Sequence, residues 1–312
     1  MTHDEIQAAL SGPIASIRTP FNEDGSIDHD GLRRMVEFDI QAGVGGLLIT
    51  WGDSLFSLLG DQDIADLTKA VVGCAAGRVP VVACTGRWGT PQAVDFASFC
   101  RNVGVDILQT FLPMWYPACL TPDAILEHHK ALAEHIPVMA NSAELQRSGP
   151  AEGRRIAETL IQDKHAVLAM KGDVTGAPDR EITTVVREDW VMLAGGQKSF
   201  HMELWPYGCR GYLSTFGTFR PSVTRAYWAA IDAGDTAAAT RIIEKIDRPF
   251  FNHILAMPGG FDAAMHGIAE ICGLAKRWRR SPFYSLSDEE LEALQAFLED
   301  LADAEKDIRE GT

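Results

Sequence analysis

The chain has 312 residues, a length that suits either two domains of ordinary size or one large α/β barrel. Its composition, 46% hydrophobic and 23% charged, is typical of a soluble globular protein and excludes a disordered, collagen-like or coiled-coil chain. The formal net charge of −15 argues against attraction to nucleic acid or to an anionic membrane.

The six cysteines are scattered and form no Cys-x-x-Cys pair. Several lie in apolar runs, where a free thiol behaves as a small hydrophobic group, so we expect them to be buried and reduced. The N-terminal segment does not resemble a secretory signal, and no run of about 18 apolar residues could span a bilayer. These features predict a cytoplasmic protein with neither membrane nor nucleic-acid partners.

Short apolar runs alternate along the chain with segments of helical periodicity. The runs cover residues 14–18, 46–50, 79–85, 106–112, 136–141, 166–171, 191–194 and 211–214. Strands this uniformly apolar are buried on both faces, as in a parallel sheet covered by helices. Eight of them predict a (β/α)8 barrel. The alternative is a doubly wound open sheet, but the first run leads into Thr19-Pro20-Phe21 and not into a glycine-rich phosphate loop.

From Pro221 onward the pattern indicates helices without strands, over residues 223–233, 236–247, 261–272 and 288–309. The last of these begins with a capping box, because Ser287 is followed three residues later by Glu290. We therefore expect residues 1–220 to form the barrel and residues 221–312 to form a helical extension packed on it.

In a parallel barrel, functional side chains lie at the C-terminal ends of the strands and in the loops that follow. Lys171 ends the sixth apolar run, so we expect it inside or just above an apolar barrel interior. Loss of hydration there would lower the pKa of the amine, and a neutral amine can attack a carbonyl group to form an imine. The alternative is a structural ion pair with Asp53 or Asp173, and the position of Lys171 does not decide between the two.

Other chemistry has weaker support in the sequence. Only Asp53 and Asp173 qualify as metal ligands at the strand ends, so no metal site is expected. No phosphate-binding loop or Gly-x-Ser-x-Gly motif is present, so no cofactor is expected. Arg147 could bind a carboxylate through its planar guanidinium group, or it could be an ordinary loop arginine.

Taken in order, these landmarks resemble the dihydrodipicolinate synthase / N-acetylneuraminate lyase family of class I, Schiff-base-forming aldolases. The motifs that carry the resemblance are residues 19–28 (TPFNEDGSID), 42–47 (AGVGGL), 79–86 (VPVVACTG), 171–173 (KGD) and 211–214 (GYLS). The resemblance implies a (β/α)8 barrel that assembles as a homotetramer or homodimer. It also implies a Schiff-base lysine at the end of the sixth strand, which is Lys171 here.

The chain departs from the family pattern at two places. Where the family has Gly-Thr-Thr-Gly-Glu, this chain has residues 51–55 (WGDSL), which places Asp53 at the second threonine. A carboxylate there would repel an anionic oxo acid unless it is protonated or paired, with Arg18 as a candidate partner. Where the family has Tyr-Asn, this chain has Ala140-Asn141, so the phenol that relays protons is missing. Tyr116 or Asp53 could replace it.

The sequence thus predicts a divergent, Schiff-base-dependent lyase of aldolase or hydratase/dehydratase type, acting on a 2-oxo acid or related carbonyl compound. Authentic dihydrodipicolinate synthase activity is not expected. Lys171 would be the nucleophile and Tyr116 the proton carrier. The expected substrate ligands are Asp53, Ser54, Asn141, Arg147, Leu213 and Ser214. The alternatives are a catalytically silent barrel that binds a metabolite and, with less support, a metal-dependent barrel aldolase.

The predicted barrel mouth is rich in large apolar side chains. Trp51, Trp88, Met114 and Trp115 all follow predicted strands. This is more aromatic surface than a small polar sugar acid needs, and it indicates either an aromatic substrate or packing against a neighbouring subunit.

Overall fold

A computed structural model describes residues 1–114 and 119–310, apart from the side chains of 304 and 307–310. The Cα atoms cluster into two units. The first contains residues 1–16 and 43–214, and the second contains residues 17–42 and the chain from residue 215 on. The division at residue 220 that the sequence suggests stays a prediction.

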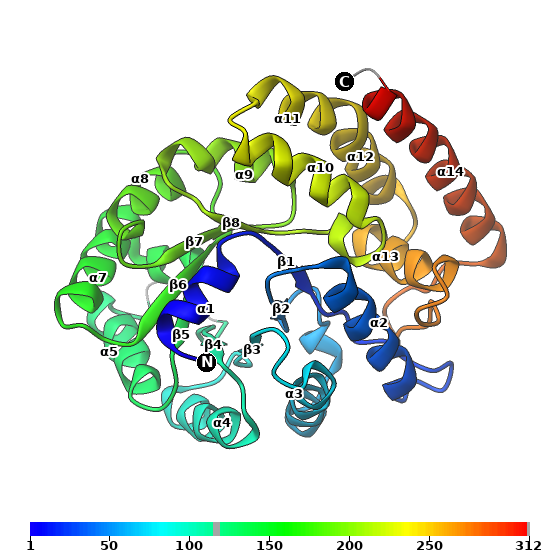
Figure 1. Cartoon of the computed structure of the whole chain (residues 1–312). Coiled ribbons are helices and arrows are strands. Elements are labelled where there is room, and N and C mark those ends of the chain that lie inside the picture. The colour runs from blue at the N-terminus through cyan, green and yellow to red at the C-terminus, as the bar shows by residue number, and fades with distance from the viewer. Residues whose placement is uncertain (115–118, 311–312) are drawn as a thin grey trace. The chain divides into compact units, whose positions relative to one another are not determined.

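Eight parallel strands close into a barrel within the first unit, and they follow one another round the ring in chain order (Figure 1). The strands are β1 Pro13–Ser16, β2 Leu47–Leu48, β3 Val81–Cys84, β4 Ile107–Gln109, β5 Val138–Asn141, β6 Val167–Gly172, β7 Val191–Ala194 and β8 Gly211–Leu213. Because β8 pairs with β1, the sheet has no edge, which rules out the open doubly wound alternative. The predicted (β/α)8 barrel is confirmed, and each strand lies at one of the eight predicted runs.

The longer helices that connect the strands of the first unit lie outside the ring of strands (Figure 1). They are α3 Asp61–Ala75, α4 Thr90–Val103, α5 Pro122–Ala133, α7 Pro150–Gln162, α8 Ala177–Val186 and α9 Lys198–Leu204. The connections also contain the short helix α6 Ser142–Leu145 and 3-10 turns at Phe56–Leu58, Gln146–Ser148 and Trp205–Tyr207. The α4, α5, α7 and α8 helices begin with proline in the first turn, where the missing N–H costs no hydrogen bond.

Helix α1 (His3–Leu10) closes the N-terminal end of the barrel, beside β6 and β7 (Figure 1). The Gln7 side chain donates to the carbonyl oxygens of Leu168, at 3.0 Å, and Asp189, at 2.7 Å. The apolar side chains of α1 join those inside the barrel. This cluster comprises Ile6, Leu10, Ile14, Leu48, Val82, Ile107, Met139, Leu168, Ala169, Val191, Leu193 and Leu213. The barrel interior is thus a packed core, and its N-terminal end is covered by α1.

Helix α1 is not among the predicted elements, although its start carries a sequence signal. Thr2 and Glu5 form a capping box, in which the Thr2 hydroxyl accepts from the Glu5 amide and the Glu5 carboxylate accepts from the Thr2 amide. The spacing Thr-x-x-Glu could have identified this helix.

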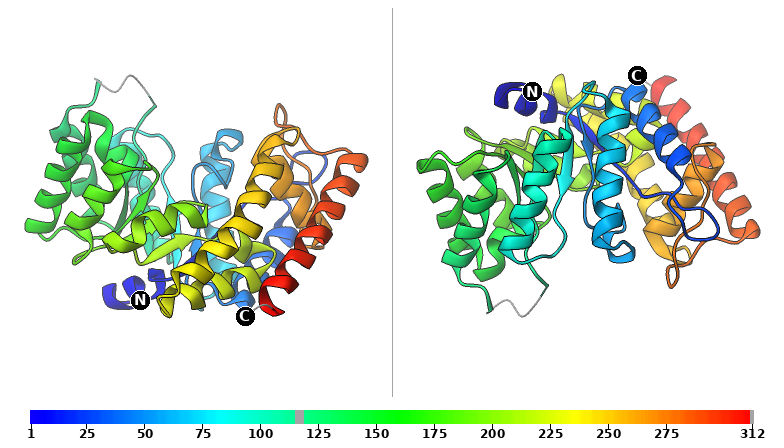
Figure 2. Two further views of the ribbon diagram at one scale, coloured as in Figure 1. Left: turned by 90° about the horizontal axis from the view of Figure 1, so that it is seen from above. Right: turned by 90° about the horizontal axis from the view of Figure 1, so that it is seen from below.

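The second unit is helical. It contains α2 His29–Ala42, α10 Pro221–Asp232, α11 Thr236–Ile242, α12 Arg248–Ala256, α13 Gly260–Ile271 and α14 Asp288–Glu310. Figure 2 shows α14 running alongside α13. The capping box at Ser287 and Glu290 is present, with the Ser287 amide 2.8 Å from the Glu290 carboxylate. The segment 236–247 does not end where predicted, because a π-helical turn at Ile243–Asp247 leads directly into α12.

None of the helices among the described residues is both long and apolar enough to cross a membrane.

The close approach of α1 to the barrel depends on glycine at position 211. A Cβ atom on Gly211 would lie 2.3 Å from the Leu10 carbonyl oxygen, whereas one on Gly12 would meet nothing within 4 Å. We expect Gly211→Ala to lower the free energy of unfolding by about 1–3 kcal/mol, because backbone must move to admit the methyl group. Gly12→Ala is the matched control and should be neutral or slightly stabilising in the same denaturant titration. Equal stability of the two variants would contradict the close approach.

Candidate active site

Lys171 lies on β6, where it is in register with Asn141 of β5 and Leu193 of β7. Ala169, two residues earlier, belongs to the apolar cluster inside the barrel. Since side chains alternate along a strand, Lys171 points the same way, at the C-terminal end of the interior. Its side chain is only 11% exposed. The structure therefore places the lysine as the sequence predicts.

The Lys171 ammonium group forms a close ion pair with the Asp173 carboxylate. The other oxygen of that carboxylate accepts from the Asn141 amide, with Nδ2 and Oδ2 2.6 Å apart. Asn141 is itself oriented by the Ala143 amide, which donates to its Oδ1 at 2.9 Å. The ion pair with Asp173, which the sequence left open, is thus formed. It supplies a proton acceptor in direct contact with the amine.

A second set of hydrogen bonds holds Asp173 in position. The Ser142 hydroxyl oxygen accepts from the backbone amide of Asp173 at 2.9 Å and donates to the Asp179 carboxylate at 3.1 Å. Asp179 also accepts from the Val174 amide and the Gln146 side chain. Burial raises the pKa of Asp179 to about 6, although these hydrogen bonds oppose the rise. Asp179 is thus a buried acid whose hydrogen bonds hold the loop that carries Asp173. A change in its protonation state would change these bonds.

A polar pair inside the barrel consists of Thr50 and Gln109. The Thr50 hydroxyl donates to Gln109 Oε1 at 3.0 Å, which joins the ends of β2 and β4 across the interior. Interior side chains of such barrels form layers contributed by alternate strands, so this pair shares a layer with Lys171 of β6. The Gln109 side chain is fully buried, and its Nε2 has no partner among the described residues. A buried donor without an acceptor is costly, and a ligand oxygen would satisfy it.

Arg147 lies in a separate cluster around Glu144, which is buried. The Glu144 carboxylate pairs with Arg147 Nη2 at 2.6 Å and with Arg87 Nη1 at 3.0 Å. Arg147 also donates to the carbonyl oxygens of Pro113, at 2.7 Å, and Leu112, at 3.3 Å. Arg147 thus ties the loop after β4 to the segment after β5. Its predicted role as a substrate ligand stays a prediction.

The other predicted ligands lie at the ends of β2 and β8. Ser54 is buried, and its hydroxyl accepts from the Thr50 amide at 3.1 Å. Ser214 is buried and donates its amide to the Ile14 carbonyl at 2.8 Å, while Leu213 belongs to the apolar cluster. Asp53 is half-buried in the turn after β2. Tyr116 lies outside the described residues.

Arg18, the partner suggested for Asp53, lies in the second unit. There its guanidinium carbon is 5.0 Å from the centre of the Phe261 ring. Its charge also opposes the rise in the pKa of Asp39, a carboxyl group whose pKa burial raises well above its ordinary value. The pairing of Arg18 with Asp53 stays a prediction.

The aromatic residues expected at the mouth have internal contacts. Trp51 packs edge-on against Phe56, and the Trp88 indole donates to the Asp61 carboxylate at 3.0 Å. Met114 is 67% exposed, and Trp115 lies outside the described residues. Much of this aromatic surface therefore organises the loops themselves.

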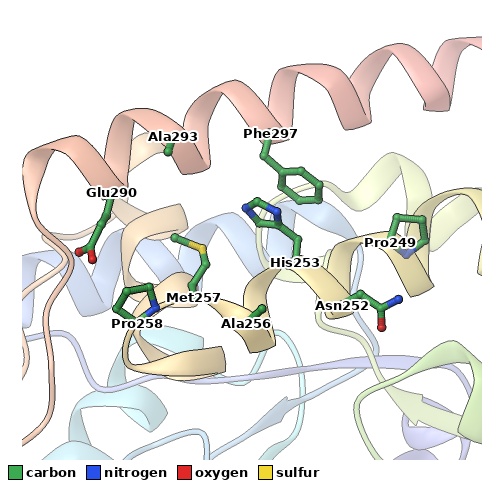
Figure 3. A pocket seen from close by; sticks show the side chains of 9 residues that line it. All are labelled: Pro249, Asn252, His253, Ala256, Met257, Pro258, Glu290, Ala293 and Phe297. Atoms are coloured by element: carbon green, nitrogen blue, oxygen red, sulfur yellow. The ribbon is translucent and has the colours of Figure 1, made fainter.

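A groove with a cavity volume of about 670 Å³ lies in the second unit, between α12 and α14 (Figure 3). Its walls are mostly apolar, and the His253 ring lies flat against the Phe297 ring with the ring centres 3.7 Å apart. Glu290 at its edge is already bound to the Tyr284 hydroxyl and the Ser287 amide. None of the residues predicted to carry chemistry lines it.

Within residues 1–114 and 119–310, no three histidine, cysteine or acidic side chains come together as a metal-binding group.

Several polar residues of these clusters are not among the site residues that the sequence predicts, namely Thr50, Arg87, Gln109, Ser142, Glu144 and Asp179. Gln109 carried a usable signal, because it is a polar residue at an inward position of an apolar strand. Glu144 and Asp179 carried none, since acidic residues in helical segments are usually solvated.

Comparison with known proteins places the chain in a defined group. The model of the dihydrodipicolinate synthetase family matches residues 9–301. Among relatives, a 4-hydroxy-tetrahydrodipicolinate synthase of Dechloromonas aromatica is 25% identical over 247 residues, which cover 76% of this chain and 80% of that protein. A Streptomyces avermitilis protein named "Probable 5-dehydro-4-deoxyglucarate dehydratase 2" is 27% identical over 297 residues, which cover 94% of this chain and 86% of that protein.

Solved structures share the fold at lower identity. N-acetylneuraminate lyase from Mycoplasma synoviae superposes with a TM-score of 0.82 at 19% identity, covering 96% of this chain and 99% of that one. Dihydrodipicolinate synthase from Aquifex aeolicus gives 0.76 at 22% identity, covering 93% and 97% respectively.

The raised pKa of Asp179 predicts a specific dependence of stability on pH. Its pKa is about 6 in the fold against 3.8 for an ordinary aspartate, so the folded state holds the proton more tightly. The contribution of this proton to stability is complete below pH 4 and is lost as the pH rises through about 6, a change of about 2–3 kcal/mol. We expect the unfolding free energy of the wild type minus that of Asp179→Asn to fall by this amount between pH 4 and pH 7.

Urea titrations at several pH values would measure this difference. The control is Glu158→Gln, which removes an exposed carboxylate and should leave the pH profile parallel to that of the wild type. Parallel profiles for Asp179→Asn would mean that Asp179 titrates like an ordinary aspartate.

Proposed function

The chain belongs to the dihydrodipicolinate synthetase family, and we propose on that basis that it is a Schiff-base-dependent lyase of aldolase or hydratase/dehydratase type. Its substrate is a 2-oxo acid or a related carbonyl compound, and Lys171 is the nucleophile. The observation that carries the proposal is the buried Lys171 amine at the open end of the barrel, in contact with the Asp173 carboxylate.

Imine formation requires that the ammonium group first lose a proton. In this proposal Asp173 accepts that proton, and the neutral amine attacks the carbonyl carbon. A second proton passes from nitrogen to the former carbonyl oxygen, which gives a carbinolamine. The hydroxyl group then takes the proton back from Asp173 and leaves as water, so the iminium ion forms and Asp173 ends in its starting state. In this proposal Asp173 therefore acts as both base and acid. The family has a tyrosine for this role at the position where this chain has Ala140.

Donors near the amine would bind the substrate oxygens. Gln109 Nε2 is buried in the interior layer that we assign to Lys171 and has no acceptor within the described part of the chain, so it is suited to hydrogen-bond an oxygen at the reacting carbon. Asn141 holds Asp173 and borders the same space. Ser54, Ser214 and the backbone near Leu213 would line the pocket, Asp53 and Arg147 would contact polar groups of the substrate, and Tyr116 remains a candidate second proton carrier.

The site does not favour the reaction of a 4-hydroxy-tetrahydrodipicolinate synthase. Asp53 stands where the family holds the oxo acid with threonine, and Ala140 stands where it relays protons with tyrosine. The similarity to a protein named as a dehydratase covers more of this chain than the similarity to the Dechloromonas synthase. We therefore propose a lyase of different substrate range, acting in the cytoplasm as a homotetramer or homodimer.

Borohydride trapping tests the nucleophile. Reduction in the presence of pyruvate, other 2-oxo acids or aromatic aldehydes should give a covalent adduct that mass spectrometry maps to Lys171. Lys171→Met should abolish it, and Lys69→Met, which removes an exposed lysine of α3, should not. Formation of the adduct in Lys171→Met would disprove the assignment.

The same experiment tests Asp173. Asp173→Asn keeps the amine and its surroundings but cannot accept the proton, so the adduct should form about 10² to 10⁴ times more slowly. The ion pair also supports the alternative of a silent barrel, in which the pair only stabilises the mouth. In that case no carbonyl compound would give an adduct, while a bound metabolite would still raise the melting temperature.

Turnover with the synthase substrates tests the substrate range. The purified protein should not convert pyruvate and aspartate semialdehyde at an appreciable rate, because the groups that bind and protonate them in the family are replaced. A parallel assay with a related synthase serves as the positive control. Full turnover by this protein would overturn the proposed substrate range.

A further inference from the structure

Arg87 is held at the barrel mouth in an unusual environment. Its guanidinium carbon lies 5.2 Å from the centre of the Trp51 ring and 4.9 Å from that of the Phe111 ring. Arg87 follows β3, and the two rings follow the neighbouring strands β2 and β4. Aromatic rings near a guanidinium group fix its position and keep water from it, which strengthens its interaction with an anion.

Among the described residues, only one end of this guanidinium group makes hydrogen bonds. Nη1 donates to the Leu112 carbonyl at 3.2 Å and to the Glu144 carboxylate at 3.0 Å. Nε is buried without a partner among the described residues, and no hydrogen bond there involves Nη2. The edge formed by Nε and Nη2 is one that matches the two oxygens of a carboxylate.

Arg87 is not needed to neutralise the charge of the Glu144 carboxylate. Arg147 already pairs with this carboxylate at 2.6 Å, which is shorter than its 3.0 Å contact with Arg87. The three side chains together carry one excess positive charge. A buried cluster with an excess positive charge and an unused donor edge favours an anionic ligand.

One short segment of the chain contacts both the Arg87 cluster and the partner of the candidate nucleophile. Asn141, which binds Asp173, and Glu144, which binds Arg87, are three residues apart in the short segment after β5. The Cys84 thiol is buried at the end of β3, the strand that precedes Arg87. Burial raises the pKa of this thiol, and the positive charges of Lys171 and Arg87 both oppose the rise.

We propose that the Nε–Nη2 edge of Arg87 is the receptor for a carboxylate of the substrate, which makes the substrate of the Lys171 site an anionic oxo acid rather than a neutral aldehyde or ketone. The family holds the oxo acid with threonine at the position where this chain has Asp53. In this proposal the Arg87 edge takes over that role. This inference rests on the proposed function for its substrate, but the anion site itself does not require imine formation.

The test compares pyruvate with methyl pyruvate, which has the same carbonyl group without the charge. Arg87→Lys keeps a cation beside Glu144 but offers no paired donors. In this variant the rate of borohydride-trapped adduct with pyruvate, relative to that with methyl pyruvate, should fall about 10- to 100-fold. Arg33→Gln, which removes an exposed arginine of α2, should leave the ratio at the wild-type value. An unchanged ratio in Arg87→Lys, or equal losses with both compounds, would overturn the proposal.

A second measurement separates this proposal from the proposed function. Lactate cannot form an imine, so its binding reports the anion site alone. It should raise the melting temperature of the wild type and of Arg33→Gln but not that of Arg87→Gln. If no carbonyl compound gives an adduct and lactate still shows this pattern, the lyase function is wrong and the carboxylate receptor stands. If lactate stabilises Arg87→Gln as much as the wild type, the receptor assignment is wrong.

Discussion

The contact between the Lys171 ammonium group and the Asp173 carboxylate organises the C-terminal end of this barrel. A charge that is mostly withdrawn from water needs a counter-charge, and the two residues are close enough in sequence for β6 and its loop to supply both. Asn141 binds the far oxygen of the carboxylate, and Ser142 binds the backbone that carries it. The segment after β5 is therefore shaped around a residue that follows β6.

This arrangement bears on the chemistry proposed for the site. The Asp173 carboxylate lies directly against the Lys171 amine. A carboxylate can take and return the same proton within one imine-forming cycle, so in the proposed reaction Asp173 can serve as both base and acid. The ion pair of Lys171 and Asp173 could serve only to stabilise the barrel mouth. Proton transfer between the two groups requires the same contact.

Other charged groups near the mouth also occur in bonded clusters. Asp179 binds the Ser142 hydroxyl that holds the Asp173 backbone, and burial raises its pKa to about 6. Glu144 is held between two arginines, and among the described residues the Nε of Arg87 has no partner. A negatively charged substrate would therefore meet a positive group at one end and the amine at the other.

The sequence by itself determined the architecture and the position of the lysine. Eight apolar runs specify a barrel because a strand with two apolar faces must be covered on both, and the last residue of the sixth run must then lie at the rim. Only the tertiary structure decided which polar groups meet there. Gln109 lies on β4, Arg87 in the loop after β3 and Glu144 on the short helix after β5. A periodicity of two or 3.6 residues reports on one element at a time. Their contacts depend on the register round the closed ring, which no local pattern in the chain records.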